Sequence, residues 1–365
     1  MVRALFLLIF FFELLGIQFL KAQTLKTYSF GVASLFGATI NRASDREFGT
    51  SKPGGIELFY HRWHNGKKYW EKLYNYPQTG WSLAWIDNRN KNLGHSFIVN
   101  RYLNYVFWRK KQFECYLKLS QGILFTTSIY ENGSNGKENF NNAISQKINF
   151  SEQLGLGIYL YPIKYTSINI AANINHYSNG ALSQPNDGLN IVNFVIGIAY
   201  TNLTKPFTPS ADTAKKPAEN RRVKVNINLA GGYKQLTPEN ETKYPLATVS
   251  LYLDKKIGNV SALNLGTDLF LNYGVKHSIA NNQNYTNTDF KRIGLTFGHE
   301  LFINKIGLLT QGGFHVYSPY PALSNFYQKV GLKYYIRDNL FIGFTLRSFR
   351  FSISDEIGWG IGLRL

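Results

Sequence analysis

The C-terminal stretch Ile357-Gly-Trp359-Gly-Ile361-Gly-Leu363-Arg-Leu365 decides the fold class of this chain. Every second residue in it is large and apolar, and the residues between them are glycine or arginine. Because side chains alternate between the two faces of a β-strand, this stretch has one apolar face and one small or polar face. A soluble sandwich buries such a face against a second sheet, and a membrane barrel turns it toward lipid. Alternation alone leaves both folds open.

The composition narrows the class of protein. The chain has 365 residues, of which 16% are aromatic and 17% are charged, with a single cysteine. This balance argues against a disordered chain, a disulfide scaffold, a coiled coil and a zinc module. The net charge of +18 suits a partner rich in phosphate, and both nucleic acid and an anionic lipid surface meet that requirement.

The N-terminus decides between those two partners. Arg3 precedes an almost wholly apolar run over residues 4–20, and Ala22 supplies a small residue for cleavage. This pattern predicts a secretory signal peptide over residues 1–22. A retained membrane anchor is the alternative, because the run is close to the lower length limit for a spanning helix. An exported basic chain is expected to meet membrane lipid and no nucleic acid.

Export and the placement of aromatic residues favour the membrane barrel over the sandwich. Tyrosine and tryptophan gather near the ends of the alternating segments, as they do at both interfaces of a membrane. The examples are Tyr102, Tyr105, Trp108, Tyr159, Tyr161, Tyr334 and Tyr335. The sequence therefore predicts an all-β fold, a transmembrane antiparallel β-barrel with an even number of strands.

A polar stretch divides the alternating segments into two sets. The first set lies within residues 23–203, near 27–40, 53–63, 80–88, 95–107, 113–130, 146–160, 164–178 and 190–202. The second set lies within residues 223–365, near 223–234, 245–256, 260–274, 290–302, 306–318, 325–336, 339–350 and 353–365. The stretch 204–222 between them is expected to be a linker. We expect about 12–16 strands, in one large barrel more than in two small ones.

Connection lengths predict which end of the barrel faces outward. The connections 109–112 and 161–164 are short, whereas 131–145 and 179–189 are longer and rich in Asn, Gly and Ser. Short turns mark the periplasmic side of outer-membrane barrels. The loop 179–189 is therefore expected on the outer side.

The segment 166–178 is the most informative about function. Its even positions form an apolar row that ends in His176 and Ser178. Residues two apart share a face with Cα atoms about 6 to 7 Å apart, so the imidazole can reach the hydroxyl. Asn190 heads the apolar row of the next segment, and a hairpin can bring it beside His176. Its side-chain oxygen would fix the tautomer in which His176 Nε2 takes a proton from Ser178.

The stretch from His176 to Asn190 reads His-Tyr-Ser-Asn-Gly-Ala-Leu-Ser-Gln-Pro-Asn-Asp-Gly-Leu-Asn. It resembles the active-site segment of the outer-membrane lipid A 3-O-deacylase family, the acyloxyacyl-hydrolase-like proteins. In that family an eight-stranded barrel carries a His-x-Ser pair and a carboxylate on its outer surface, and hydrolyses the acyl ester at the 3-position of lipid A. The resemblance implies that His176 is the base and Ser178 the nucleophile. It also associates Asn186 with the oxyanion hole and Asn179 with the shared signature.

The sequence departs from the family pattern at two points. The family has a Glu at the position of Asn190, and this chain continues well beyond an eight-strand unit. Asn190 is expected to orient the imidazole, and Asp187 in the loop is the alternative acid. Backbone N–H groups between Asn179 and Gly188 are expected to join Asn186 as oxyanion donors.

These observations predict a serine esterase of the bacterial outer membrane that removes an acyl chain from lipopolysaccharide, with no metal or cofactor. Outer-leaflet lipid A and membrane lipids are the expected partners, and a homo-oligomer is compatible with the sequence. Two alternatives stay open. His176 and Ser178 can be interfacial polar residues without chemistry, and the chain can be a non-catalytic pore or structural barrel. A wide polar channel in the second half would support a pore. Pairs of bulky side chains that cross the interior would support a filled scaffold.

Overall fold

The structure is a computed structural model of the chain. It describes residues 27–40, 50–133, 138–139, 141–202, 214, 222–351 and 353–365. Within these residues strands dominate, and no helix has both the length and the apolar character needed to cross a membrane. The signal peptide expected over residues 1–22 lies outside the described residues, as does nearly all of the linker expected over 204–222.

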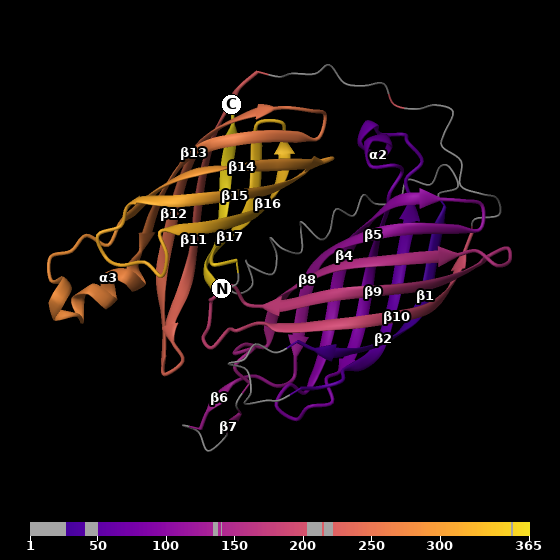
Figure 1. Ribbon diagram of the computed structural model, residues 1–365, viewed down its shortest axis with the longest axis horizontal. Helices are drawn as coiled ribbons and strands as arrows, with labels where there is room; N and C mark the ends of the chain where they lie inside the picture. Colours follow the sequence, from indigo (N-terminus) through magenta and orange to yellow (C-terminus); the bar gives the residue numbers. More distant parts are fainter. Residues whose placement is uncertain are drawn as a thin grey trace.

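Eight strands of the N-terminal half form one closed antiparallel barrel (Figure 1). They are β1 (Tyr28–Thr39), β2 (Gly54–Trp63), β3 (Gln78–Asp87), β4 (His95–Arg109), β5 (Phe113–Thr126), β8 (Ile148–Leu160), β9 (Thr166–Ser178) and β10 (Leu189–Thr201). Pairing of β1 with β10 closes the wall, from Ser29 opposite Thr201 to Thr39 opposite Ile191. A short helix, α2 (Tyr69–Leu73), lies in the connection between β2 and β3. Two short strands, β6 (Glu131–Asn132) and β7 (Glu138–Asn139), pair in the connection between β5 and β8.

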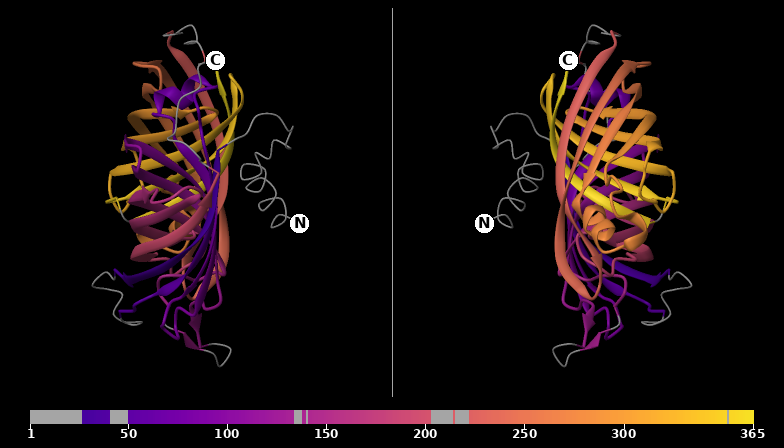
Figure 2. Two further views of the ribbon diagram at one scale, coloured as in Figure 1. Left: turned by 90° about the vertical axis from the view of Figure 1, so that its right-hand side faces the viewer. Right: turned by 90° about the vertical axis from the view of Figure 1, so that its left-hand side faces the viewer.

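Eight strands of the C-terminal half form a second closed barrel. They are β11 (Lys224–Thr237), β12 (Asn240–Lys256), β13 (Ser261–Asn272), β14 (Arg292–Ile303), β15 (Ile306–Tyr317), β16 (Phe326–Arg337), β17 (Leu340–Phe349) and β18 (Ile353–Arg364). β11 pairs with β18 to close the wall. The connection between β13 and β14 holds α3 (Tyr273–Ala280) and the 3-10 turn η1 (Gln283–Tyr285). The strands of both barrels are tilted, as closure requires (Figure 2).

Each of the sixteen alternating segments holds one barrel strand, but the expectation of one large barrel is wrong. The strands close as eight and eight because the first and last strand of each half pair with each other. That pairing satisfies the backbone groups that an open edge would expose. An eight-stranded barrel is also the size whose interior side chains can fill completely.

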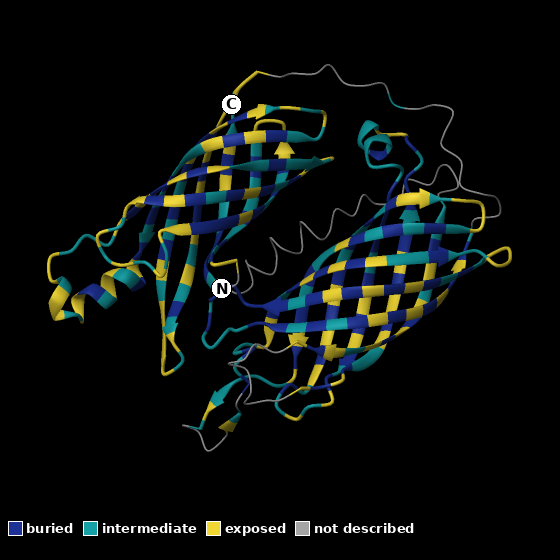
Figure 3. Cartoon of the chain, in the orientation of Figure 1, coloured by how far each residue is buried: buried dark blue, intermediate teal, exposed yellow. Residues whose placement is uncertain are grey.

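The outer surface of both barrels is an apolar belt. In Figure 3 the strands alternate between buried and exposed residues along their length. On β9, for example, Ile170 and Ile174 are exposed while Asn173 and Asn175 between and beyond them are buried in the lumen. This inside-out pattern is the reverse of a soluble protein and fits a barrel that meets lipid.

Connections of different length gather at opposite ends of each barrel. Short ones join β4 to β5, β8 to β9, β14 to β15 and β16 to β17. Long ones join β5 to β8, β9 to β10 and β13 to β14. We refer to the two ends as the short-turn end and the long-loop end. Three connections depart from this rule. The one that carries α2 is long and lies at the short-turn end, and the turns from β11 to β12 and from β17 to β18 are short and lie at the long-loop end.

The interior of the N-terminal barrel is filled mostly by amide and aromatic side chains. Asn173 Nδ2 donates a hydrogen bond to Asn193 Oδ1 at 3.1 Å, and the Tyr102 ring is fully buried between strands. Near the short-turn end, the carboxylate of Glu114 accepts hydrogen bonds from four side chains, which are those of Trp63, Gln78, Arg109 and Tyr161. These contacts cross the lumen and fill it.

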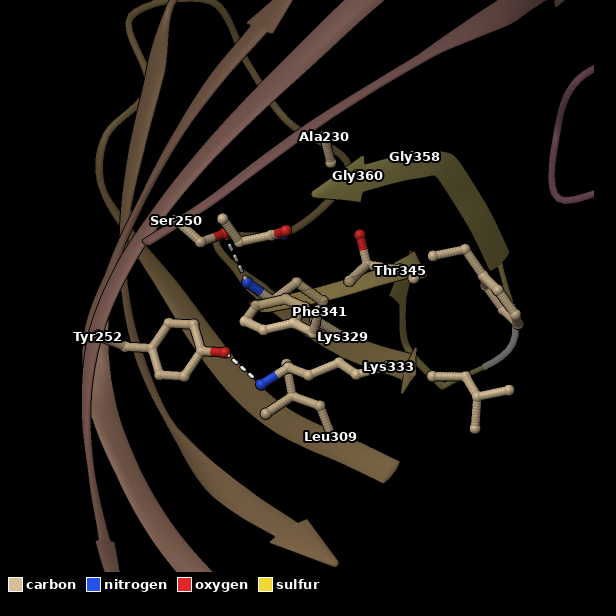
Figure 4. A pocket seen from close by; sticks show the side chains of 14 residues that line it. Ala230, Ser250, Tyr252, Leu309, Lys329, Lys333, Phe341, Thr345, Gly358 and Gly360 are labelled. Atoms are coloured by element: carbon tan, nitrogen blue, oxygen red, sulfur yellow. Dashed lines mark hydrogen bonds between the residues drawn. The ribbon is translucent and has the colours of Figure 1, made fainter. Parts of the chain in front are cut away.

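Among the described residues, the interior of the C-terminal barrel is crossed by more ion pairs than that of the N-terminal barrel, where the pairs are Lys118 with Glu57 and Arg109 with Glu114. Lys329 Nζ lies 2.6 Å from Asp268 Oδ1, and Lys333 Nζ lies 2.6 Å from Glu300 Oε2. Figure 4 shows the same two lysines reaching Ser250 and Tyr252 across the lumen. A third cluster joins the cations Lys234 and Arg347 to the carboxylates Asp355 and Glu356. Bulky pairs therefore cross this interior, which matches the filled scaffold and not the wide channel of a pore.

The two barrels contact each other at both ends. At the short-turn end, the Tyr74 hydroxyl donates to the carbonyl of Phe302 at 2.9 Å. Toward the long-loop end, the ring of Phe150 on β8 stacks on Phe344 of β17 at 5.9 Å and lies 6.3 Å from the ring of Trp359 on β18.

Candidate functional site

The β9–β10 hairpin places Asn190 beside His176. The two residues are direct partners in the antiparallel register, and His176 Nδ1 lies 2.8 Å from Asn190 Oδ1. Asn190 Nδ2 faces the carbonyl of Gly188 at 3.5 Å, which is consistent with the amide oxygen pointing at the imidazole. An amide oxygen can only accept, so Nδ1 carries the proton and Nε2 presents its lone pair. The hairpin thus holds His176 in the tautomer that a general base needs.

Ser178 ends the same outward row of β9. Tyr177 between them is 2% exposed and points into the lumen, so His176 and Ser178 point out of the barrel. His176 is half-buried, and Ser178 is 9% exposed. Within the described residues the two side chains form no direct hydrogen bond, although positions two apart on a strand are within side-chain reach. Catalytic hydrogen bonds are often long before substrate binds.

The backbone of Gly188 packs closely against the imidazole of His176. Its φ is +80°, a left-handed conformation that favours glycine. A Cβ built on Gly188 would lie 2.5 Å from His176 Cε1, which is closer than atoms can pack. Any side chain at this position would push the ring away from Asn190. The expected loop residue Gly188 therefore contributes through its missing side chain.

The loop after Ser178 is braced by Asn179. Its side chain is fully buried, donates to Ser145 Oγ at 3.2 Å and accepts from the Ser183 N–H at 3.2 Å. Its backbone N–H donates to Asn186 Oδ1 at 2.8 Å. This last bond uses the oxygen of the Asn186 amide, so Nδ2 is the end of that side chain that can serve as a donor.

Most of the backbone N–H groups expected at the oxyanion hole already donate hydrogen bonds, either within the loop or to the connection between β5 and β8. Asp187 N–H donates to Asn142 O at 3.1 Å, and Gly188 N–H donates to Ala143 O at 3.1 Å. The N–H groups of residues 179, 182 and 183 also donate within the loop. The first backbone N–H groups after Ser178 that form none of these hydrogen bonds are those of residues 180 and 181.

The structure pairs His176 with Asn190 and not with the alternative acid Asp187. It also reveals a carboxylate that the sequence analysis missed. Glu152 on β8 is the direct cross-strand partner of His176, on the side opposite Asn190. Facing residues have Cβ atoms about 4.5 to 5.5 Å apart, which brings an exposed carboxylate within reach of the imidazole. The sequence does mark this residue, because Glu152 is acidic while the other even-numbered residues between 148 and 156 are apolar.

No three His, Cys, Asp or Glu side chains form a metal-binding group in the part of the chain that the structure describes. The candidate site thus consists of hydroxyl, imidazole, amide and carboxylate groups. These groups can transfer protons and form an acyl ester, as serine hydrolases do.

An eight-stranded barrel with an apolar outer belt defines a transmembrane β-barrel protein. Two family models match the chain: lipid A 3-O-deacylase (PagL) over residues 54–199, and the acyloxyacyl hydrolase C-terminal domain over residues 223–365. Together they cover well over half of the sequence, and the chain belongs to the lipid A 3-O-deacylase family of the outer membrane. A search of curated proteins found no match.

Several solved barrels are similar in outline. The outer membrane enzyme PagL is 18% identical with a TM-score of 0.31, over 46% of this chain and 97% of its own. Neisserial surface protein A is 7% identical with a TM-score of 0.34, over 47% of this chain and 96% of its own. A variant of the Rh. blastica porin is 11% identical with a TM-score of 0.20, over 93% of this chain and 99% of its own.

Proposed function

We propose that this chain hydrolyses an ester-linked acyl chain of lipid A, at the 3-position by analogy with its family, through a Ser-His-Asn site on the lipid-facing surface of the N-terminal barrel. The observation that carries the proposal is the 2.8 Å contact between His176 Nδ1 and Asn190 Oδ1. It sets up Nε2 as a base on the same outward row as the Ser178 hydroxyl. An interfacial polar pair without chemistry would not need this oriented tautomer.

The reaction follows from these positions. Ser178 Oγ attacks the ester carbonyl carbon while its proton passes to His176 Nε2. The negative oxygen of the tetrahedral intermediate is held by Asn186 Nδ2 and the backbone N–H groups at 180 and 181. The intermediate collapses, the sugar hydroxyl leaves with the proton from His176, and the acyl chain stays on Ser178. Water, deprotonated by His176, then releases the fatty acid and restores the serine.

Asn190 orients the imidazole but carries no charge to stabilise the imidazolium that forms. Glu152 on β8 is the cross-strand partner of His176 and would supply a carboxylate beside the ring. A carboxylate on that side of the ring would attract the positive charge that forms on the imidazole during the reaction. The work of the family's single acid is thus divided between an orienting amide and a separate carboxylate.

The placement on the barrel exterior suits the substrate. Acyl chains of lipid A already lie in the outer leaflet, alongside exposed residues such as Ile170 and Ile174 of β9. The substrate therefore reaches Ser178 by lateral diffusion, without leaving the membrane.

Mass spectrometry of lipid A from cells that express the wild type or Ser178→Ala tests the proposal. We expect the wild type to remove one acyl chain and Ser178→Ala to leave lipid A intact. Ser324→Ala, in a loop of the C-terminal barrel, is the matched control and is expected to keep the activity. Equal acylation with folded wild type and folded Ser178→Ala would contradict the proposal.

A further inference from the structure

The outward row of β18 differs in exposure along its length. Ile361 is 52% exposed and Leu363 is 41% exposed, as expected for residues of an apolar belt. Ile357 belongs to the same row but is 2% exposed. On the neighbouring strand, the outward residue Phe344 is buried as well. Something therefore covers the outer face of β17 and β18 toward the long-loop end, and it does not cover the rest of β18.

The residues that cover this part of β17 and β18 belong to the N-terminal barrel and lie next to the candidate site. Phe150, which faces Ser178 across β8 and β9, stacks on Phe344 with ring centroids 5.9 Å apart and an interplanar angle of 19°. Gly180, two residues after Ser178, abuts Ile357: a Cβ built on it would lie 3.0 Å from Ile357 Cβ. The contact thus involves residues on both sides of Ser178.

The contact closes only one flank of the site. On the β8 side, Phe150 is half-buried against the other barrel, and Ser178 is itself buried. Farther along β9, Ile174 is 55% exposed, and Phe194 on β10 is 55% exposed as well. An acyl chain that approaches Ser178 along the exposed row of β9 and β10 therefore ends against the C-terminal barrel.

We infer that the outer face of β17 and β18, with Ile357, Phe344 and Trp359, forms one wall of the acyl-chain site at Ser178. This inference rests on the proposed function and deepens it. The C-terminal barrel contributes no group to the bond cleavage. It limits the space beside the reacting ester and selects the length of the acyl chain. The wall is apolar, as burial of a hydrocarbon chain requires.

The first test measures the contact without any activity. Cys115 is the only native thiol, so a Cys115→Ser background isolates introduced cysteines. The pair Phe150→Cys and Phe344→Cys, treated with a short bis-maleimide in outer-membrane vesicles, should give an intramolecular cross-link detected by mass spectrometry of peptides. The pair Phe150→Cys and Ile361→Cys is the control and should not cross-link. Equal yields from the two pairs would overturn the inference.

The second test measures selectivity with the full chain. Ile357→Ala should shift the ratio of long to short acyl chains released from lipid A by about tenfold or more, because a single methylene in a hydrophobic pocket changes discrimination by about 10- to 200-fold. Ile361→Ala, on the same row but exposed, should leave the ratio within about twofold of the wild type. Ile357→Val provides a smaller change that keeps the fold, and it should shift the ratio in the same direction. Heat-modified gel mobility checks that each variant is a folded barrel.

The two proposals fail in distinguishable ways. If Ser178→Ala abolishes release but Ile357→Ala and Ile361→Ala behave alike, the wall is wrong and the hydrolase stands. If Ser178→Ala retains activity, the proposed site is wrong, and with it the function of the wall, even where the cross-link shows the contact.

Discussion

The two barrels of this chain share their architecture and differ in what their side chains do. Each closes eight tilted strands and presents an apolar belt. The N-terminal barrel fills its lumen largely with amides and aromatics, and it carries a hydroxyl and an imidazole on its outward surface. The C-terminal barrel fills its lumen with ion pairs. At the corresponding hairpin, between β17 and β18, it has a tight turn in place of the loop 179–188.

This difference between the two interiors suggests that one barrel is the more sensitive to the loss of a buried partner and that the other carries the proposed site. Buried ion pairs are strongly coupled, because removal of one partner leaves an uncompensated charge in a region without water. A neutral amide network is more tolerant of change. The C-terminal barrel is therefore expected to be more sensitive to the loss of one buried group, and the N-terminal barrel carries the loop of the proposed site. The following experiments test this contrast, from the largest expected effect to the smallest.

Asp268→Asn should destabilise the C-terminal barrel by about 3 to 5 kcal/mol, because it leaves the buried Lys329 ammonium without its carboxylate. Asn173→Ala in the N-terminal barrel removes a neutral hydrogen bond and should cost about 1 to 2 kcal/mol. Urea unfolding in detergent micelles, followed by circular dichroism, compares the two. Losses of equal size would remove the contrast between the two interiors.

Gly188→Ala should lower the deacylation rate about 100-fold, because a Cβ would displace the His176 ring and misplacement by about 1 Å has an effect of that size. Gly258→Ala is the matched substitution in the C-terminal barrel, where a Cβ meets nothing within 4 Å. It should leave the rate unchanged. Rates are measured as fatty acid released from lipid A in micelles. An active Gly188→Ala enzyme would show that the imidazole position does not matter.

Asn190→Glu should raise the rate about tenfold, because a carboxylate both orients the imidazole and stabilises its charged form. Glu152→Gln should lower the rate of the wild type severalfold, and should have little effect once Glu is present at position 190. The four rates form a double-mutant cycle. Strictly additive effects would mean that Glu152 does not share the work of the missing acid.

Acidification should loosen the short-turn end of the N-terminal barrel, where α2 is held by His64 and Glu71. Burial lowers the pKa of His64 below its usual 6.5. Burial raises the pKa of Glu71, but the hydrogen bond from His64 and further bonds outweigh it, so the net pKa is lowered. Both groups bind fewer protons when folded, so their contributions are present at neutral pH. The His64 contribution is lost as the pH falls below about 6.5, and the Glu71 contribution only as it falls below about 4.5.

The expected loss at α2 is about 1 kcal/mol, the size of one buried hydrogen bond. Trp70, which packs on the His64 ring at 4.8 Å, reports it by fluorescence between pH 7.5 and 5. Glu71→Gln should increase the pH dependence, because the Glu71 carboxylate and its hydrogen bond raise the pKa of His64 against the effect of burial. The short-turn end of the C-terminal barrel has only tight turns and provides the internal reference. An unchanged Trp70 signal across this range would contradict the assignment.

Local patterns in the sequence predicted much of this molecule. Alternation located all sixteen barrel strands, because each strand places every second residue in lipid or in the lumen. The hairpin between Ser178 and Asn190 followed from the same parity, and the structure places Asn190 against His176. The prediction of a single barrel failed, because closure depends on the pairing of β1 with β10 and of β11 with β18, which lie far apart in sequence.

Other features of the site required the structure for similar reasons. The side chain of Asn179 is used to brace the loop through Ser145, a residue of another connection. Glu152 is the cross-strand partner of His176 only because β8 and β9 pair in one particular register. A shift of one residue would turn it into the lumen.

The sequence by itself determined the strands, their inward and outward faces and the residue types at the site, because these depend on neighbours along the chain. The tertiary structure decided how many barrels close, which acidic residue faces His176 across the strands, and that the second barrel lies beside Ser178. Those outcomes depend on register and contact between segments that are distant in the chain, and no local periodicity encodes them.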